Sequence, residues 1–95
     1  MSEMVPSSGA RGRRVTVGER EVLLTPTEAR LLEALRGEPG RVFSRGELAA
    51  LVMPDAVVLE RTIDVHVKSL RKKLGDLAEM IQTVRRQGYQ FVSRG

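Results

Sequence analysis

Apolar residues recur at helical spacing in three segments of the chain. The first segment, residues 26–36, has apolar positions at Ala29, Leu31, Leu32 and Leu35. The second, residues 45–52, has them at Leu48, Leu51 and Val52. The third, residues 60–74, has them at Ile63, Val67, Leu70 and Leu74. Because a period near 3.6 places such residues on one face, the pattern predicts three helices that bury these side chains.

Polar residues mark where the first two helices begin. Thr25 is followed three residues later by Glu28, and Ser44 by Glu47. Each pair is able to form a capping box, in which the two side chains satisfy backbone N–H groups at the helix start. Glycine and proline provide the expected stops, at Gly37, Pro54 and Gly75.

Short alternating segments lie on either side of the helices. Residues 14–17 and 21–24 predict one hairpin, and residues 80–85 and 89–93 predict another. The order hairpin, three helices, hairpin predicts an α+β fold in a single domain. We expect that domain at residues 14–95.

A leader rich in Ser, Gly and Pro is expected at residues 1–13. Three arginines near its end either form a basic arm that reaches a DNA groove or belong to a disordered linker: Arg11, Arg13 and Arg14.

Composition excludes most enzymatic chemistry. The 95 residues contain no cysteine and one histidine, His66, so a thiol nucleophile, a disulfide framework and a Cys- or His-based metal cluster are excluded. We expect no catalytic residue, no metal and no cofactor. No apolar segment approaches the ~20 residues that cross a bilayer. The sequence therefore predicts no membrane partner, and a cytoplasmic protein.

The positive charge is concentrated at the carboxyl end. Lys and Arg number 16 against 12 Asp and Glu, a formal charge of +4. Residues 1–59 hold eight bases and eight acids, whereas residues 60–95 hold eight bases and four acids. An excess confined to one part of the chain indicates an anionic partner there.

The helix expected at residues 60–74 has a cationic side opposite its apolar side. At 100° per residue, this outer side carries Arg61, Val65, Lys68 and Lys72, with Thr62 and Ser69 beside them. A helix with an apolar back and long cationic side chains in front suits the major groove of duplex DNA. Val65 has no evident role on a solvated surface, but it matches the methyl group of thymine.

Two adjacent arginines, Arg85 and Arg86, lie at the tip of the second hairpin. Arginine on a hairpin is able to enter the minor groove, where the negative potential is strong. The same residues could equally keep an exposed hairpin soluble.

Four stretches of the chain match the sequence pattern of a known family and occur in the same order as in that family. They are LTPTEARLL at residues 24–32, PGRVFSR at 39–45, RTIDVHVKSLRKKLG at 61–75 and IQTVRRQGYQF at 81–91. Over these stretches the chain resembles the OmpR/PhoB-type winged helix-turn-helix effector domain of bacterial response regulators. The resemblance implies a winged helix with short N-terminal antiparallel strands, a three-helix core and a C-terminal β-hairpin wing.

The resemblance also implies roles for single residues. Positions that commonly touch phosphate are matched by Arg61, Thr62, His66, Lys68 and Arg71. Positions facing base edges are matched by Val65 and Ser69. In the wing, Arg85 matches the arginine of the minor groove, and the flanking positions are Thr83 and Tyr89. Lys72 and Arg86 complete the predicted site.

Three residues depart from the family pattern. Met53 stands where tryptophan is usual, Ser69 where a basic residue is frequent, and Arg86 where a small residue is common. We therefore expect a different sequence preference and an added phosphate contact at Arg86.

These observations predict sequence-specific binding to double-stranded DNA by a regulator of the two-component, phosphorelay type. The resemblance implies two copies on direct repeats and contact with RNA polymerase through the apolar loop 54–59. Receiver domains usually precede such modules, so the chain is either the effector half of a longer regulator or a stand-alone protein.

Two alternatives remain at this point. A single-strand binder would need stacking aromatics, and the chain has Phe43, Tyr89 and Phe91. A protein-interaction winged helix would use the 54–59 loop instead of DNA.

Overall fold

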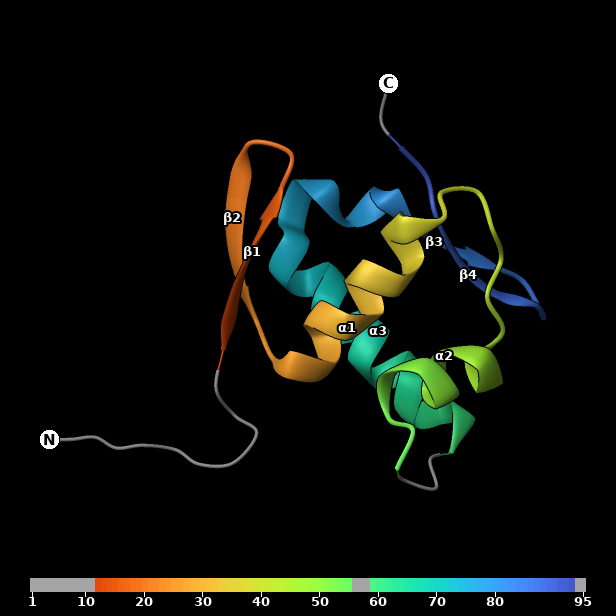
Figure 1. The fold of residues 1–95 in the computed structure, drawn as a ribbon. Coiled ribbons are helices and arrows are strands. Elements are labelled where there is room, and N and C mark those ends of the chain that lie inside the picture. Colours follow the sequence, from red (N-terminus) through yellow and green to blue (C-terminus); the bar gives the residue numbers. More distant parts are fainter. Residues whose placement is uncertain (1–11, 56–58, 94–95) are drawn as a thin grey trace, which may run out of the picture.

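The computed structural model describes residues 12–55 and 59–93 and confirms the predicted α+β winged-helix architecture. Three helices form the centre of the molecule, with a hairpin at either end (Figure 1). In chain order the elements are β1 (Arg13–Val17), β2 (Arg20–Leu24), α1 (Pro26–Gly37), α2 (Arg45–Val52), α3 (Glu60–Leu74), the 3-10 helix η2 (Gly75–Met80), β3 (Ile81–Val84) and β4 (Gly88–Phe91).

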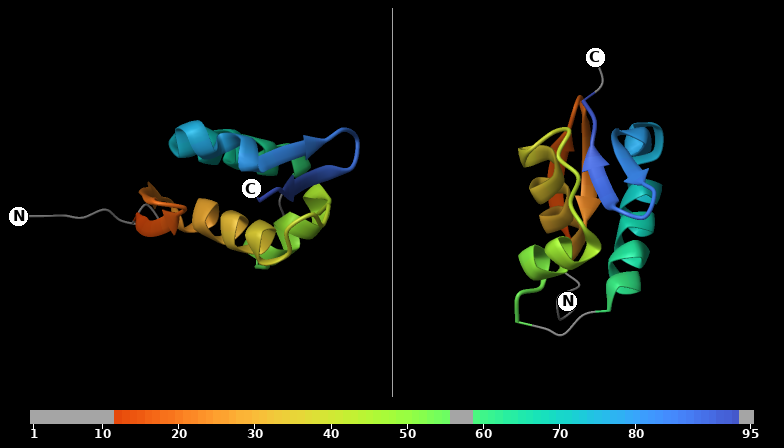
Figure 2. Two further views of the ribbon diagram at one scale, coloured as in Figure 1. Left: turned by 90° about the horizontal axis from the view of Figure 1, so that it is seen from above. Right: turned by 90° about the vertical axis from the view of Figure 1, so that its right-hand side faces the viewer.

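The two hairpins are separate two-stranded antiparallel sheets. In the first, Val17 pairs with Arg20, so the turn is shorter than predicted and consists of Gly18 and Glu19. The second, residues 81–91, is the wing, and its strands end where Val84 pairs with Gly88. Figure 2 shows the first hairpin and the wing at opposite ends of the helices, with the wing beside α3.

Both predicted capping boxes are present. The backbone N–H of Glu28 donates to Thr25 Oγ1 at 3.1 Å, and that of Thr25 donates to Glu28 Oε1 at 2.9 Å. Ser44 and Glu47 make the same pair of bonds at 3.0 and 2.9 Å. These contacts satisfy N–H groups that have no partner within the helix, so α1 and α2 begin at defined residues.

The predicted apolar stripes form the core, with one exception. The predicted core positions of α1 and α3 are all buried, as are Leu48 and Val52 of α2. Leu51 is 56% exposed, so the expectation that it points inward was wrong. Leu48 and Val52, four residues apart, share the buried line of this short helix, and Leu51 lies at its edge beside a hollow between α1 and α2.

The loop before α2 is joined to the wing. Phe43 and Tyr89 exchange two backbone hydrogen bonds, of 2.8 and 3.0 Å. A third bond of 2.8 Å runs from the N–H of Gly40 to the carbonyl of Phe91. The segment between α3 and the wing is the 3-10 helix η2, which begins at Gly75 with a φ of 59°. Backbone hydrogen bonds therefore join the wing to the loop before α2, and η2 joins it to α3.

Some predictions fall outside the described residues. These are the predicted leader as far as Arg11 and residues 56–58 of the loop at 54–59. Arg13 and Arg14 belong to β1, where their guanidinium groups lie 3.3 Å from Glu33 and 3.8 Å from Glu21. Within residues 12–55 and 59–93, no helix is long and apolar enough to cross a membrane.

Replacing Gly88 with alanine should destabilise the wing. Gly88 has a φ of 145°, and an added Cβ would overlap the carbonyl oxygen of Phe43 and lie 2.9 Å from Cα of Ser44. Strain and overlap together should lower the free energy of unfolding by about 3 kcal/mol in urea titrations. Gly37→Ala is the matched control, because nothing lies within 4 Å of its added Cβ. Equal stability of the two variants would contradict this account of Gly88.

Candidate nucleic-acid interface

The side chains of α3 divide into four sides with different surroundings. Ile63, Val67, Leu70 and Leu74 form the buried back. The opposite side, which we call the front, carries Arg61, Val65, Lys68 and Lys72, all of them exposed. Val65 is 64% exposed, an unusual position for a β-branched apolar residue in the middle of a helix. The front thus combines three cations with one apolar contact point.

One flank of α3 contacts α1 through a buried carboxylate. Glu28 is 2% exposed. Its Oε2 accepts a hydrogen bond from Ser69 Oγ at 2.6 Å, and its Oε1 lies 2.7 Å from Lys73 Nζ. Burial opposes ionisation of Glu28, but the bonds from Lys73, Ser69 and the Thr25 backbone outweigh it and lower the pKa. The capping carboxylate of α1 therefore also orients α3.

The other flank of α3 contacts the wing and α2. Asp64 Oδ1 accepts from Tyr89 Oη at 2.6 Å and from Arg45 Nε at 2.7 Å. Burial alone would raise the pKa of Asp64, but these two donors outweigh it and lower the pKa. Seven residues later, Arg71 donates to the carbonyl of Ile81 at 3.0 Å and to Thr83 Oγ1 at 2.9 Å.

The wing tip presents two arginines to solvent. The turn is closed by a bond of 2.9 Å from the N–H of Gln87 to the carbonyl of Val84. Arg85 and Arg86 are both exposed. Arg86 has a φ of 67° and is the one non-glycine residue with a positive φ in the described part of the chain. Such a backbone favours glycine, so a long cationic side chain is held here at a conformational cost.

Most cations have structural partners, and the remainder gather in one region. Arginines on several elements bind carbonyl groups: Arg20 binds that of Leu74, Arg30 that of Val52 and Arg36 that of Thr16. Other cations, among them Arg41, Arg45 and Lys73, pair with carboxylates. Within the described part of the chain, the cations that form neither a hydrogen bond nor an ion pair are Arg61, Lys68, Lys72, Arg85 and Arg86. All five belong to the front of α3 or to the wing tip.

Some predicted site residues have a different environment from the one expected. Ser69 was expected to face base edges, but its hydroxyl is bound to Glu28, on the α1 flank. Arg71 was expected to touch phosphate, but its guanidinium binds the wing and lies over the ring of Tyr89. Tyr89 is 5% exposed. The side chains of Ser69, Arg71 and Tyr89 are oriented by contacts with residues far away in the sequence, which helical spacing does not reveal.

The remaining predicted residues lie near the front. Thr62 and His66 are half-buried beside it, and Thr83 is exposed on the wing. Sequence reasoning missed Glu28 as a tertiary contact, and it missed Asp64 and Arg45. The seven-residue spacing of Asp64 and Arg71, which places both on one flank, was the available signal.

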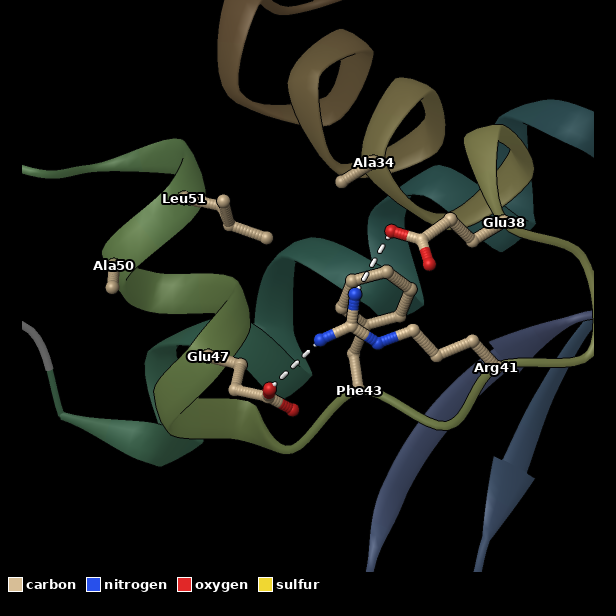
Figure 3. A pocket seen from close by; sticks show the side chains of 7 residues that line it. All are labelled: Ala34, Glu38, Arg41, Phe43, Glu47, Ala50 and Leu51. Atoms are coloured by element: carbon tan, nitrogen blue, oxygen red, sulfur yellow. Dashed lines mark hydrogen bonds and ion pairs between the residues drawn. The ribbon is translucent and has the colours of Figure 1, made fainter.

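The described part of the surface includes two hollows near α2 and the start of α3. One lies at the start of α3 and is lined by Arg45, Leu59, Glu60, Arg61 and Asp64. The other, shown in Figure 3, is lined by Ala34, Glu38, Arg41, Phe43, Glu47, Ala50 and Leu51. In this second hollow Arg41 is paired with Glu38 at 2.8 Å and Glu47 at 3.0 Å, and it stacks on Phe43. Its cation is neutralised, which disfavours this hollow as an anion site.

The aromatic residues do not form a stacking surface. Phe43, Tyr89 and Phe91 are 2%, 5% and 7% exposed. Binding of single strands depends on bases stacking on accessible rings. Burial of these rings argues against the single-strand alternative.

Comparison with known proteins identifies the family. The model of the family described as "Transcriptional regulatory protein, C terminal" matches residues 19–91. The chain belongs to this family. Among its relatives is the phosphate regulon transcriptional regulatory protein PhoB of Rhizobium meliloti (strain 1021), which is 52% identical over 83 residues. That match covers 84% of this chain and 37% of PhoB, so the chain spans little more than a third of such relatives.

Solved structures of family members have the same fold. The DNA-binding domain of the response regulator AdeR, in complex with an intercistronic region, is 36% identical with a TM-score of 0.75. The match covers 85% of this chain and 86% of AdeR's. The DNA-binding domain of RstA from Klebsiella pneumoniae, in complex with the RstA box, is 29% identical with a TM-score of 0.70. That match covers 90% of this chain and 95% of the RstA chain.

Replacing Glu28 with glutamine should change how stability depends on pH. The lowered pKa means that ionised Glu28 stabilises the fold above its ordinary value of 4.5 and loses this effect as the pH falls through the lower folded value. We expect Glu28→Gln to cost about 2 kcal/mol near pH 7 and progressively less in acid, measured by urea unfolding from pH 7 to pH 3.

The control is Glu33→Gln, whose carboxylate is paired with Arg13 but is 48% exposed. It should cost little at any pH, because exposed ion pairs contribute little. A cost of Glu28→Gln that stayed constant down to pH 3 would contradict the assignment.

Proposed function

We propose that this domain binds double-stranded DNA sequence-specifically and regulates transcription, with α3 in the major groove and the wing tip in the minor groove. The main support for this proposal is that the unpaired cations cluster on the front of α3 and at the wing tip. Over residues 12–55 and 59–93, the arginines of other elements are bound within the protein, whereas the cations of the α3 front and the wing tip are left for an external anion. The AdeR and RstA domains, each in complex with DNA, support the same conclusion.

The front of α3 supplies two kinds of contact. Lys68 and Lys72 are long enough to reach phosphates or guanine edges, while Val65 presents an apolar surface to a thymine methyl. Arg61 and Thr62 lie in the first turn, where α3 has no side-chain cap. The helix dipole there favours a backbone phosphate.

The wing supplies a third contact. Arg85 enters the minor groove, and Arg86 contacts a phosphate at its edge. Tyr89 and Thr83, which the family resemblance also assigns to the DNA contact, lie next to this tip and keep it in place through Asp64 and Arg71.

Further parts of the proposal concern the whole regulator. We infer that two copies bind direct repeats, that the loop at 54–59 contacts RNA polymerase, and that a phosphorelay controls the protein in the bacterial cytoplasm. The family relationship supports these inferences, and PhoB is described as a transcriptional regulatory protein of the phosphate regulon.

Binding should depend strongly on salt. Release of counterions by about five phosphate contacts should give a slope of log K against log salt near −4 to −5. The measurement is a fluorescence anisotropy titration on a duplex selected from a random pool. Lys68→Ala should make the slope shallower by about 1 for every sequence, whereas Val65→Ala should change the preferred sequence and leave the slope unchanged. A slope near zero for the unmodified chain would overturn the proposed function.

Replacing Arg86 with glycine should increase the stability of the domain and weaken its binding to DNA. Glycine relieves the positive φ of 67°, so the free energy of unfolding should rise by about 1 kcal/mol. Loss of one phosphate contact should nevertheless weaken DNA binding several-fold and reduce the salt slope by about 1. Arg86→Asn, which tolerates the same backbone conformation, should bind as weakly as the glycine variant. Unchanged affinity in both would show that Arg86 makes no DNA contact.

A further inference from the structure

The wing is joined to α3 covalently through η2, and its backbone is hydrogen-bonded to the loop before α2. Side-chain contacts add direct links between the wing and α3. Two such contacts lie on the same flank of α3. Arg71 binds β3 through Ile81 and Thr83, and Asp64 binds β4 through the hydroxyl of Tyr89. These contacts orient the two elements that the proposed function assigns to the two grooves.

Asp64 differs from Arg71 because it links three elements instead of two. Its Oδ1 accepts from Tyr89 on β4 and from Arg45, the first residue of α2. The backbone of Tyr89 is paired with Phe43, just before α2. The wing, the start of α2 and the first half of α3 therefore form a closed set of contacts, and Asp64 completes it.

The position of this contact is close to the proposed DNA-binding groups. Asp64 immediately precedes Val65 of the front, and Tyr89 pairs with Thr83 two residues before Arg85. Tyr89 is buried, so its hydroxyl has a defined position, and burial together with the bond to Asp64 raises its pKa. A shift at this contact would move Val65 and Arg85 relative to each other.

We propose that Asp64 is a positioning residue that sets the wing at the distance and angle from α3 at which both grooves are contacted together. The proposal rests on the proposed function. Asp64 lies off the front and has both donors inside the protein, so it acts on DNA through the placement of Arg85.

A double-mutant cycle tests this coupling. The affinity for the selected duplex is measured for the unmodified chain, Asp64→Ala, Arg85→Ala and the double variant. Arg85→Ala should weaken binding about tenfold in the unmodified chain and less than about threefold when Asp64 is absent, because the displaced wing no longer places the arginine in the groove. Asp64→Asn, which keeps one acceptor oxygen, should give an intermediate factor.

Two further measurements separate positioning from stability. Glu33→Gln removes an ion pair of α1 remote from the wing, and the tenfold effect of Arg85→Ala should persist in that background. Replacing the A·T pairs under the wing by G·C should weaken the unmodified chain and leave Asp64→Ala nearly unaffected. If Asp64→Ala does not fold, as judged by circular dichroism, Asp64→Asn replaces it in the double-mutant cycle with Arg85→Ala.

The possible failures are distinguishable. If Arg85→Ala has no effect in the unmodified chain, the wing part of the proposed function is wrong and the positioning role falls with it. If Arg85→Ala lowers the affinity for DNA by the same factor with and without Asp64, the positioning role alone is overturned.

Discussion

The carboxylate of Glu28 is charged and almost completely buried, and it connects the start of α1 to the carboxyl-terminal half of α3. An ionised group in such a place is tolerated only when its oxygens are hydrogen-bonded. The Thr25 backbone, the Ser69 hydroxyl and the Lys73 ammonium meet this requirement. The position of α3 relative to the core, and with it the direction of the front, depends on this group of bonds.

The opposite flank of α3 is held in a comparable way by the wing and α2. Asp64 and Arg71 bind partners on β3, β4 and α2, so polar contacts fix the helix on both sides of its front. Packing of the apolar back holds α3 against the core. The polar contacts on its two flanks constrain its rotation further, because a hydrogen bond requires a particular distance and direction.

The distribution of cations connects this architecture to function. Arg20, Arg30 and Arg36 bind backbone carbonyls of neighbouring elements, and Arg41 and Arg45 are paired with carboxylates. The net charge of +4 is thus not spread evenly over the surface. Paired cations stabilise the fold, and the unpaired ones of α3 and the wing tip form the surface that suits a polyanion.

The sequence by itself determined the helices, their capping boxes, the buried stripes and the cationic front and wing tip. These features follow from short spacings, since a helix brings together residues three and four apart. Only the tertiary structure decided that Leu51 is exposed, that Ser69 and Arg71 bind within the protein, and that Glu28 and Asp64 link separate elements. Lys73 binds a residue 45 positions away and Tyr89 one 25 away. No local pattern encodes such pairs, because they form only once the apolar faces have packed and brought distant side chains together.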